Sequence, residues 1–190
     1  LRALADRKEC LAGVPVDAFI AAAKDANPRV QAAAIVGLGR LGDVKATKVL
    51  LQTQVPASLQ IPEKGTEGPH ATPNSGVVLP HLAVKSLVEL NAVDQTLDAL
   101  EDNPKLALWA LKYMHDTRAV DGLIQAYGKA DSEIKKVILN TLARLYQQEA
   151  PYDGSWWWGT RPDTHGPYYK AEDWEESEKI KSFLLAEVDK

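Results

Sequence analysis

The amino-acid sequence predicts an all-α fold made of successive helix pairs. The first observation behind this prediction is that apolar residues recur with the three- and four-residue spacing of helices that bury one face. The second is that no segment alternates with a period of two, so strands are not expected. The third is internal repetition, because four segments of the 190-residue chain share one scheme.

The apolar spacing is clearest in three stretches, and each is expected to form a helix with one broad buried face. The first comprises Val30, Ala33, Ala34, Val36, Gly37, Leu38 and Leu41. The second comprises Leu106, Trp109, Ala110, Tyr113 and Met114, and the third Ile134, Val137, Ile138, Thr141, Leu142 and Leu145. We expect these side chains to contribute to the hydrophobic core.

The four repeated segments begin at Asn27, Pro80, Asn103 and Asp131. Three of them open with a helix-start signal, which is Asn-Pro at 27 and 103 and Asp-Ser at 131. An Asn or Asp side chain accepts hydrogen bonds from the free N–H groups of a first turn, and Pro fits there because it has no N–H to lose. The first three segments then reach a break before an expected second helix, near Gly42-Asp43, Asn91 and His115-Asp116.

The spacing of the repeats is uneven. Aligned on Leu41, Leu90, Met114 and Leu145, they lie 49, 24 and 31 residues apart. The short middle spacing predicts a truncated second helix, and the long first spacing comes from an insertion at 53–80 with five Pro and three Gly in 28 residues. Neither helix nor strand should persist across it. We expect an ordered excursion anchored by Ile61, Val77, Val78 and Leu79, with a mobile surface loop as the alternative.

These segments resemble the HEAT-repeat family, particularly its short bacterial form. The resemblance covers roughly residues 14–148. It rests on Asn-Pro-x-Val/Leu before an Ala/Leu-rich helix, and on Gly42-Asp43-x-Lys45-Ala46 and Asp116-Thr117-Arg118-Ala119-Val120. In such repeats the Asp caps the second helix and the Arg or Lys reaches neighbouring repeats. Because one helix pair cannot bury its apolar face alone, the resemblance implies a right-handed α-solenoid of about four HEAT-like pairs.

We expect the repeat array to occupy residues 1–150 and a different region to follow at 151–190. Residues 146–174 hold four of the six Tyr and four of the five Trp, and Pro and Gly residues prevent a regular helix there. A final amphipathic helix is expected to start at 173–177. Its expected buried stripe is Ile180, Phe183, Leu184 and Val188.

The aromatic loop has two interpretations, which do not exclude each other. It can be a structural cap over the apolar flank of the last repeat. It can also be a binding surface, because three consecutive Trp side chains cannot all point the same way, and exposed aromatics stack on sugars, bases or apolar partner groups. The candidate surface consists of Trp156, Trp157, Trp158, Arg161, Asp163, His165, Tyr168 and Tyr169.

The stretch GSWWWGTRPDTHGPYYKAEDWEESEKI is similar to HEAT-containing regions of large multidomain proteins of planctomycete-type bacteria. Those proteins resemble membrane-bound or secreted dehydrogenases, with a propeller domain before the repeats and a c-type cytochrome domain after them. The resemblance implies an exported linker or scaffold. The chain opens LRALADRKEC without an initiator Met, so we expect a fragment of a larger protein. It lacks CxxCH, so no covalent haem is expected in it.

Composition and motifs argue against catalysis, cofactors and nucleic-acid binding. Residues 151–190 hold five Lys/Arg and nine Asp/Glu, which accounts for the net charge of −4, while residues 1–150 hold 17 of each. No basic face for phosphates is visible, and no run reaches the roughly 18 apolar residues of a membrane span. The four His lack metal-site spacing, and Cys10 is alone. The glycines of GLGRLG follow a helix pattern, so they are expected to allow close helix packing and to end the helix.

We therefore expect a non-catalytic protein-interaction or spacer module, whose partner is another protein or a flanking domain of the same polypeptide. The first alternative is carbohydrate binding by the Trp/Tyr-rich loop. The second is a HEAT-like DNA glycosylase that uses Trp109 and Asp116. However, Trp109 fits the apolar stripe of its helix, Asp116 fits a helix cap, and no Lys/Arg row accompanies them.

Overall fold

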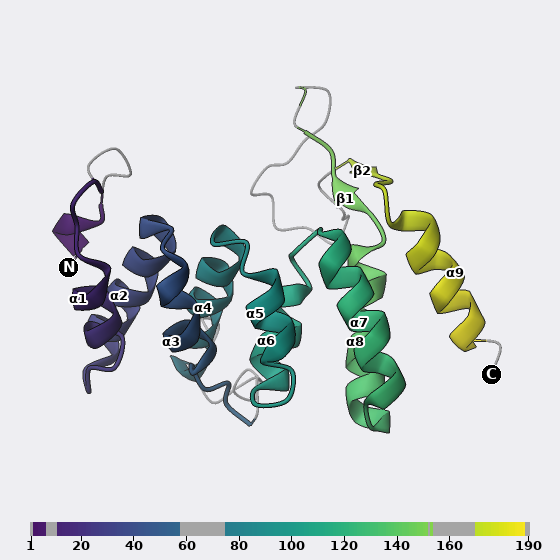
Figure 1. Ribbon diagram of the computed structural model, residues 1–190, viewed down its shortest axis with the longest axis horizontal. Coiled ribbons are helices and arrows are strands. Elements are labelled where there is room, and N and C mark those ends of the chain that lie inside the picture. Colours follow the sequence, from purple (N-terminus) through teal and green to yellow (C-terminus); the bar gives the residue numbers. More distant parts are fainter. Residues whose placement is uncertain (1, 7–10, 58–74, 152, 154–169, 189–190) are drawn as a thin grey trace, which may run out of the picture. The chain divides into compact units, whose positions relative to one another are not determined.

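The structure, a computed structural model, describes residues 2–6, 11–57, 75–151, 153 and 170–188. This part of the chain contains nine α-helices, three short 3₁₀ segments and one pair of two-residue strands (Figure 1). The prediction of an all-α fold is confirmed in its main feature. The chain divides into two compact units, Leu1–Met114 (unit 1) and His115–Lys190 (unit 2).

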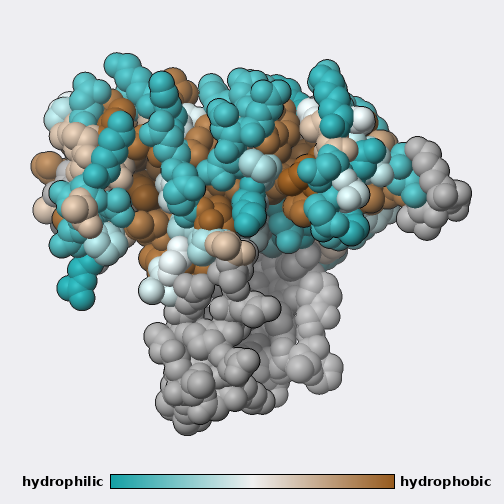
Figure 2. All heavy atoms as spheres, turned by 90° about the horizontal axis from the view of Figure 1, so that it is seen from below, coloured by the Kyte–Doolittle hydropathy of each residue, from teal (hydrophilic) through white to brown (hydrophobic). Residues whose placement is uncertain are grey.

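Unit 1 contains α1 Val16–Ala22, α2 Pro28–Leu41, α3 Thr47–Leu51, α4 Val78–Glu89, α5 Val93–Asp98 and α6 Pro104–Leu111. Its 3₁₀ segments are Arg2–Leu4, Val44–Ala46 and Ser75–Val77. α2 packs against α1 and α4, and α4 packs in turn against α6, while α3 lies against α4 and α5. In the left half of Figure 2, hydrophobic side chains in brown lie in recesses between ridges of hydrophilic ones in teal.

α2 forms as its sequence predicts. Asn27 Oδ1 accepts a hydrogen bond from Arg29 N at 2.9 Å, and Pro28 occupies the first turn. The helix ends at Gly42, whose φ of 70° lies in the left-handed region that favours glycine. Asp43 then caps the next 3₁₀ segment by accepting from Lys45 N at 2.9 Å.

The glycines inside α2 let neighbouring side chains approach its backbone. A Cβ on Gly37 would clash with ring carbon Cε1 of Phe19, a fully buried residue of α1. A Cβ on Gly39 would lie 2.6 Å from Ser86 Oγ of α4. This approach allows Ser86 Oγ to donate a hydrogen bond to Ile35 O at 2.9 Å. The predicted roles of these glycines, close packing and helix termination, are confirmed.

The C-terminal end of the insertion is helical, so the prediction of irregular chain across 53–80 is wrong for its last six residues. The 3₁₀ segment Ser75–Val77 leads directly into α4. Pro80 does not interrupt α4 because it lies in the first turn, where N–H groups have no intrahelical acceptor. Among the expected anchors, Val77 and Leu79 are half-buried, Val78 is 47% exposed, and Ile61 lies outside the described residues.

The middle repeat is short, as its spacing predicts. α5 has six residues and is separated from α4 by Asn91, whose φ is 48°. Asn tolerates this left-handed conformation better than most residues because its short polar side chain can hydrogen-bond locally. The predicted break near Asn91 and the truncated second helix are therefore confirmed.

Asn103 precedes α6 just as Asn27 precedes α2, but it does not cap its helix. Its side chain makes no capping bond, and Nδ2 instead donates to Leu51 O and Thr53 O, both at 3.0 Å. The prediction of a cap is therefore wrong at this position. The physical reason is that carbonyl groups at the end of α3 lack intrahelical donors, and the amide supplies them.

Unit 2 contains α7 Thr117–Lys129, α8 Ser132–Leu145 and α9 Ser177–Val188, with strands β1 Gln148–Glu149 and β2 Ala171–Glu172. α7 packs against α8, and α8 packs against α9. Asp116 caps α7 by accepting from Arg118 N at 2.9 Å, and Asp131 caps α8 through two backbone N–H groups. In the expected stripe of the last helix, Ile180 is fully buried and Phe183 and Leu184 are half-buried. The side chain of Val188 lies outside the described residues.

Two residues assigned to buried helix faces are exposed. Tyr113 is 45% exposed because α6 ends at Leu111, so the helical spacing no longer applies to it. Val137 is 44% exposed and lies beside the buried face of α8, which comprises Ile138, Thr141, Leu142 and Leu145. The β1–β2 pair also departs from the prediction of no strands, because two-residue strands are too short to show an alternating pattern.

Candidate functional site

The eight candidate residues of the aromatic loop all lie between 154 and 169, outside the described residues. They are Trp156, Trp157, Trp158, Arg161, Asp163, His165, Tyr168 and Tyr169. The structure describes the chain on both sides of this segment, and those flanks form its base in unit 2.

The base is an antiparallel ladder. β1 pairs with β2, with Gln148 opposite Glu172 and Glu149 opposite Ala171. A further backbone hydrogen bond, from Ala150 N to Lys170 O at 2.8 Å, extends the ladder toward the segment. The residues that precede and follow segment 151–169 are therefore hydrogen-bonded to each other. We call residues 147–150 and 170–173 the clasp.

Side chains reinforce the clasp on the side toward α8. Gln148 Nε2 donates to Glu172 Oε1 at 3.1 Å, and Gln147 Nε2 donates to Asp173 Oδ1 at 2.8 Å. Arg144 lies 3.9 Å from Glu149 in an ion pair. The clasp thus combines backbone and side-chain bonds, which limits how far its two strands can separate.

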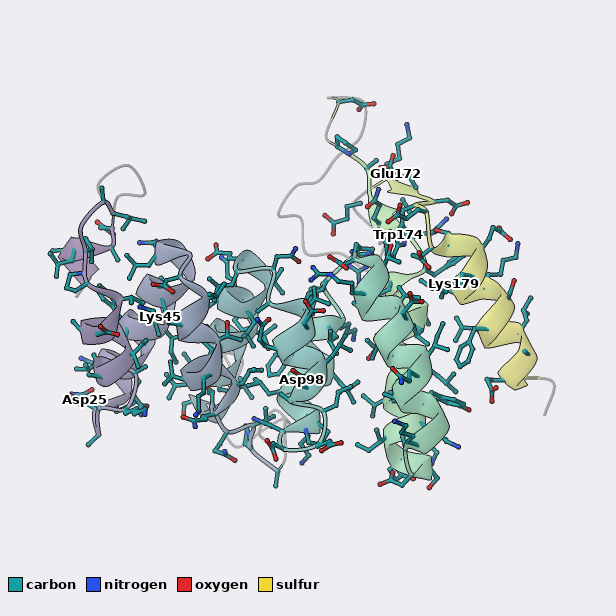
Figure 3. All side chains as sticks on the ribbon, viewed as in Figure 1. Asp25, Lys45, Asp98, Glu172, Trp174 and Lys179 are labelled. Atoms are coloured by element: carbon teal, nitrogen blue, oxygen red, sulfur yellow. The ribbon has the colours of Figure 1, made fainter. Side chains whose placement is uncertain are left out.

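Trp174 joins the clasp to the end of α8, and Figure 3 shows it beside the strands at the start of α9. Its indole Nε1 donates to Leu145 O at 2.7 Å, and its backbone N donates to Ser177 Oγ at 2.9 Å. Ser177 Oγ in turn donates to Tyr146 O at 2.6 Å. These bonds satisfy carbonyl groups that the end of α8 leaves without intrahelical donors.

His115 supports Trp174 from the turn before α7. The two rings meet edge to face with centroids 5.3 Å apart. His115 Nε2 lies 3.0 Å from Gln147 O, an arrangement in which a protonated Nε2 donates to the carbonyl. Burial lowers the pKa of His115, and nearby Arg144 lowers it further, whereas the bond to Gln147 and the charge of Glu149 raise it. The imidazole is therefore neutral at pH 7, and it holds the clasp in place.

Polar pairs also hold α9 to α7. Thr117 Oγ1 donates to Glu175 Oε1 at 2.7 Å. Lys179, labelled in Figure 3, forms a hydrogen bond to Asp121. Its Nζ also lies 3.0 Å from Glu176 Oε2, and this contact is an ion pair without hydrogen-bond geometry. The hydrogen bond to Asp121 and the neighbouring Glu176 carboxylate raise the pKa of Lys179. Lys179 and Asp121 lie at the surface, so water and salt screen their interaction, whereas Glu176 is buried.

Tyr127 makes a further contact between α7 and α9. Its ring meets that of Phe183 edge to face, with centroids 5.3 Å apart, and its hydroxyl donates to Glu187 Oε2 at 2.8 Å. Lys135 of α8 lies 5.0 Å from the centre of the same ring. The contacts of Tyr127 with Phe183 and Glu187 therefore help to attach α9 to α7.

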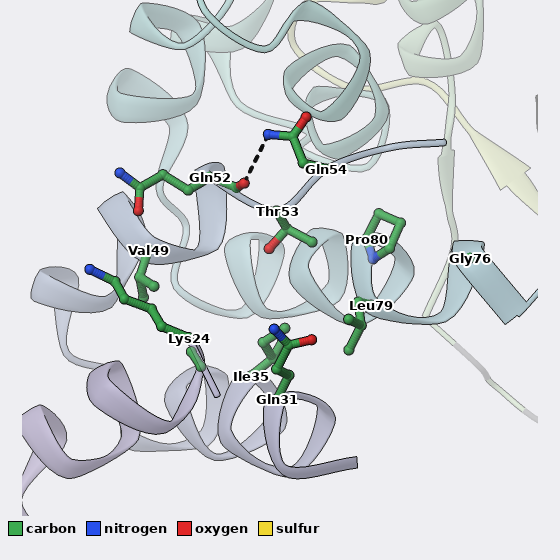
Figure 4. A pocket seen from close by; sticks show the side chains of 11 residues that line it. Lys24, Gln31, Ile35, Val49, Gln52, Thr53, Gln54, Gly76, Leu79 and Pro80 are labelled. Atoms are coloured by element: carbon green, nitrogen blue, oxygen red, sulfur yellow. Dashed lines mark hydrogen bonds between the residues drawn. The ribbon is translucent and has the colours of Figure 1, made fainter. Parts of the chain in front are cut away.

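Unit 1 contains a cleft of about 340 Å³ between α2 and the ends of α1 and α3 (Figure 4). This volume lies at the lower end of the range for small-molecule sites. The apolar part of its lining comprises Ile35, Val49, Leu79 and Pro80, and the polar part comprises Lys24, Gln31, Gln52, Thr53 and Gln54. Both ends of the insertion contribute, because Thr53 and Gln54 lie at its start and Leu79 and Pro80 at its end.

The polar side of the cleft has unused hydrogen-bonding capacity. Gln54 Nε2 donates to Gln52 O at 3.2 Å, which fixes the backbone there. Within the described part of the chain, the side chains of Lys24, Gln31 and Gln52 form no hydrogen bond. Lys24 is the single charged group among the described lining residues. This region was not singled out from the sequence, and the Gln-Thr-Gln stretch after α3 is the one local signal that points to it.

The two residues considered for a glycosylase both have structural roles. Trp109 is half-buried on α6, and its ring tilts against that of exposed His81 on α4, with centroids 6.1 Å apart. Asp116 caps α7 and forms an ion pair with Arg118 at 2.8 Å. These contacts agree with the sequence interpretation of an apolar stripe and a cap. His70 and His165 lie outside the described residues.

In the described ranges, no three His, Cys, Asp or Glu side chains gather as a metal site. None of the helices that the structure describes has the length and apolar character needed to cross a bilayer. Comparison with protein-family models gives no match, and comparison with curated proteins gives none either. The resemblances drawn from the sequence therefore remain predictions.

Proposed function

We propose that the chain is a non-catalytic protein-interaction or spacer module, built as a right-handed solenoid of about four HEAT-like helix pairs. Its partner is another protein or a flanking domain of the same polypeptide. The contact surface in this proposal is the aromatic loop around Trp156–Trp158, the segment that the clasp flanks on both sides.

The helix packing of unit 1 supports the solenoid. The first helices of successive pairs, α2, α4 and α6, pack one against the next, and the second helices α3 and α5 are also in contact. Stacking of this kind buries apolar faces that a single pair would leave exposed. In unit 2, α9 packs against α8 and thereby covers one side of the last pair, which suits a terminal cap.

The clasp is the main structural support for the proposed protein-interaction function. It fixes both flanks of a segment, 151–169, that holds three Trp and three Tyr, so part of the entropy cost of presenting these side chains is met before a partner arrives. Aromatic residues on a fixed base are the usual anchors of protein interfaces. The polar groups at the base engage one another and Trp174, which is consistent with a structural support for the segment.

Thermal unfolding of the chain and of Trp156→Ala, Trp157→Ala and Trp158→Ala tests this proposal. A Trp that serves as a contact residue is exposed, so its replacement should change stability by under about 0.5 kcal/mol. Replacing a Trp that serves as a buried cap should lower the free energy of unfolding by roughly 3–5 kcal/mol. The proposal requires at least one variant with an unchanged midpoint. Acrylamide quenching of Trp fluorescence provides an independent measure of the same exposure.

The outcomes separate the functions considered from the sequence. A large loss of stability in all three variants would make the segment a cap and remove it as the contact surface. If one variant keeps its midpoint, that variant and the unaltered chain should be compared for binding to glycan and peptide arrays. Peptide binding lost in the variant supports the proposal, whereas glycan binding lost in the variant replaces it with carbohydrate recognition.

A further inference from the structure

The cleft in unit 1 combines an apolar floor with a rim that carries one positive charge. Ile35 and Val49 of the floor are buried, and Leu79 is half-buried. On the rim, Lys24 and Gln52 are exposed, and in Figure 4 the ends of their side chains lie on the same side of the cleft. No Asp or Glu occurs among its described lining residues, and Lys24 is the charged group among them.

We propose that this cleft binds a carboxylate attached to a short, branched apolar group. The carboxylate accepts hydrogen bonds from the ammonium group of Lys24 and the side-chain amide of Gln52, and the apolar group covers Ile35, Val49 and Leu79. Two sources offer this chemistry, the C-terminus of a peptide that ends in Leu or Val, and a free short-chain acid. The described lining residues all belong to unit 1.

Charge and hydrogen bonding decide between ligand classes. A single ammonium matches a single negative charge, whereas phosphate recognition usually calls on several cationic or backbone donors. The Gln amides supply further neutral donors without another charge. An exposed rim keeps the carboxylate partly hydrated, so its transfer into the cleft avoids the cost of burying an unpaired charge. The floor adds apolar surface, whose removal from water by the ligand favours binding.

The volume sets the size of the ligand. At about 340 Å³, the cleft suits a terminal residue or a small acid, and a long peptide would have to continue over the rim into solvent. Binding is expected to be weak for the free acid and tighter for a peptide whose backbone also reaches Gln31 and Gln54. Both side chains contribute to the lining.

Titration of the whole chain, followed by ¹H–¹⁵N correlation spectra, tests the proposal. The probes are N-acetyl-Ala-Leu with a free carboxylate, the same dipeptide with a C-terminal amide, and 4-methylpentanoate. Signals of Gln31, Gln52 and Gln54 should shift with the free-carboxylate peptide, and the amide should bind about tenfold more weakly because it loses a charge-assisted hydrogen bond. A peptide that binds more tightly than 4-methylpentanoate identifies a peptide C-terminus as the source, and the reverse order identifies a free acid.

Two exposed lysines give a matched pair of variants. Lys24→Gln removes the ammonium group that is proposed to bind the carboxylate. It should weaken binding of the free-carboxylate peptide about tenfold and leave binding of the amide peptide unchanged. Lys48→Gln removes an exposed lysine of α3 that does not line the cleft, and it should have no effect. Circular dichroism confirms that both variants are folded. Equal binding of acid and amide, equal weakening in both variants, or no shift of the three Gln signals at millimolar probe would each overturn the proposal.

Discussion

The junction around α2 in unit 1 and the junction around α9 in unit 2 hold their helices in different ways. At α2, glycines bring Phe19 and Ser86 against the helix backbone, and the contact depends on the absence of side chains. At α9, the contact is made by polar side chains of Trp174, Ser177 and Lys179 around one fully buried residue, Ile180.

This difference predicts which changes should destabilise each junction. Close packing depends on volume, so the α2 junction should respond to changes in side-chain size and hardly at all to pH or salt. Hydrogen bonds and ion pairs depend on protonation and screening, so the α9 junction should respond to both. The four predictions below run from the largest expected effect to the smallest.

The largest effect is expected at Phe19. Phe19→Ala should lower the free energy of unfolding by about 3–5 kcal/mol, because it leaves a cavity against α2. Gly37→Ala alone should cost about 1–3 kcal/mol through overpacking. In the Phe19→Ala background the same change should be neutral or stabilising, since the clashing ring is gone. Urea unfolding of the single and double variants measures this coupling.

Gly128 provides the control for this cycle. It lies on α7, and a Cβ there would meet nothing within 4 Å. Gly128→Ala should therefore stabilise the chain by up to about 1 kcal/mol through helix propensity alone. If Gly37→Ala stabilised as much as Gly128→Ala, the α2 junction would not be limited by volume.

The second effect is expected at Ser177. Ser177→Ala removes the acceptor of Trp174 N and the donor to Tyr146 O, and should cost about 1–3 kcal/mol because buried groups lose their partners. Ser182→Ala, on the exposed side of α9, should stay within about 0.5 kcal/mol. Thermal unfolding of both variants makes the comparison, and similar midpoints would show that Ser177 does not secure α9.

The third effect is a dependence on pH. Because the folded pKa of His115 lies below its ordinary value of 6.5, the unfolded chain binds more protons, and stability should fall as the pH is lowered through 6.5. His115→Gln should reduce the difference between unfolding midpoints at pH 7.5 and 5.5. His81→Gln, at an exposed histidine, should keep the pH dependence of the unaltered chain. An undiminished dependence in His115→Gln would assign the effect to other groups.

The smallest effect is expected at Lys179. The side chains of Lys179 and Asp121 are exposed, although Glu176 is buried, so Lys179→Gln should lower stability by about 1 kcal/mol or less. The loss should shrink further in 0.5 M NaCl because salt screens exposed charges. Unfolding midpoints at low and high salt measure this, and a loss that is independent of salt would mean that Lys179 acts through packing of its aliphatic chain.

The sequence predicts well what depends on neighbouring residues. Caps at Asn27, Asp116 and Asp131 were predicted because the capping side chain and the backbone N–H group that donates to it lie within three residues of each other. The glycines of α2 and the truncated α5 were also predictable, from helix periodicity and from repeat spacing. All of these features are local, so no knowledge of the rest of the fold was needed.

The sequence fails where distant groups compete for the same side chain. Asn27 and Asn103 both precede Pro, yet Asn103 bonds to α3 because the end of that helix lies close to it in the fold. The clasp escaped prediction for a similar reason, since its strands are separated by more than twenty residues and each is only two residues long. The cleft likewise draws on residues from several helices, so the Gln-Thr-Gln stretch after α3 is not enough to predict it.

The bonds of Asn103 have a consequence for the way unit 1 folds. They join positions 50 and 52 residues apart and pass over the intervening pair α4–α5, so they close a long loop that is costly to form early. In an array where each pair contacts only its neighbours, pairs can unzip one at a time from an end. A direct link between the first and third pairs opposes such fraying. Unit 1 should accordingly melt as one cooperative block, and hydrogen exchange in α3 should be as slow as in α6.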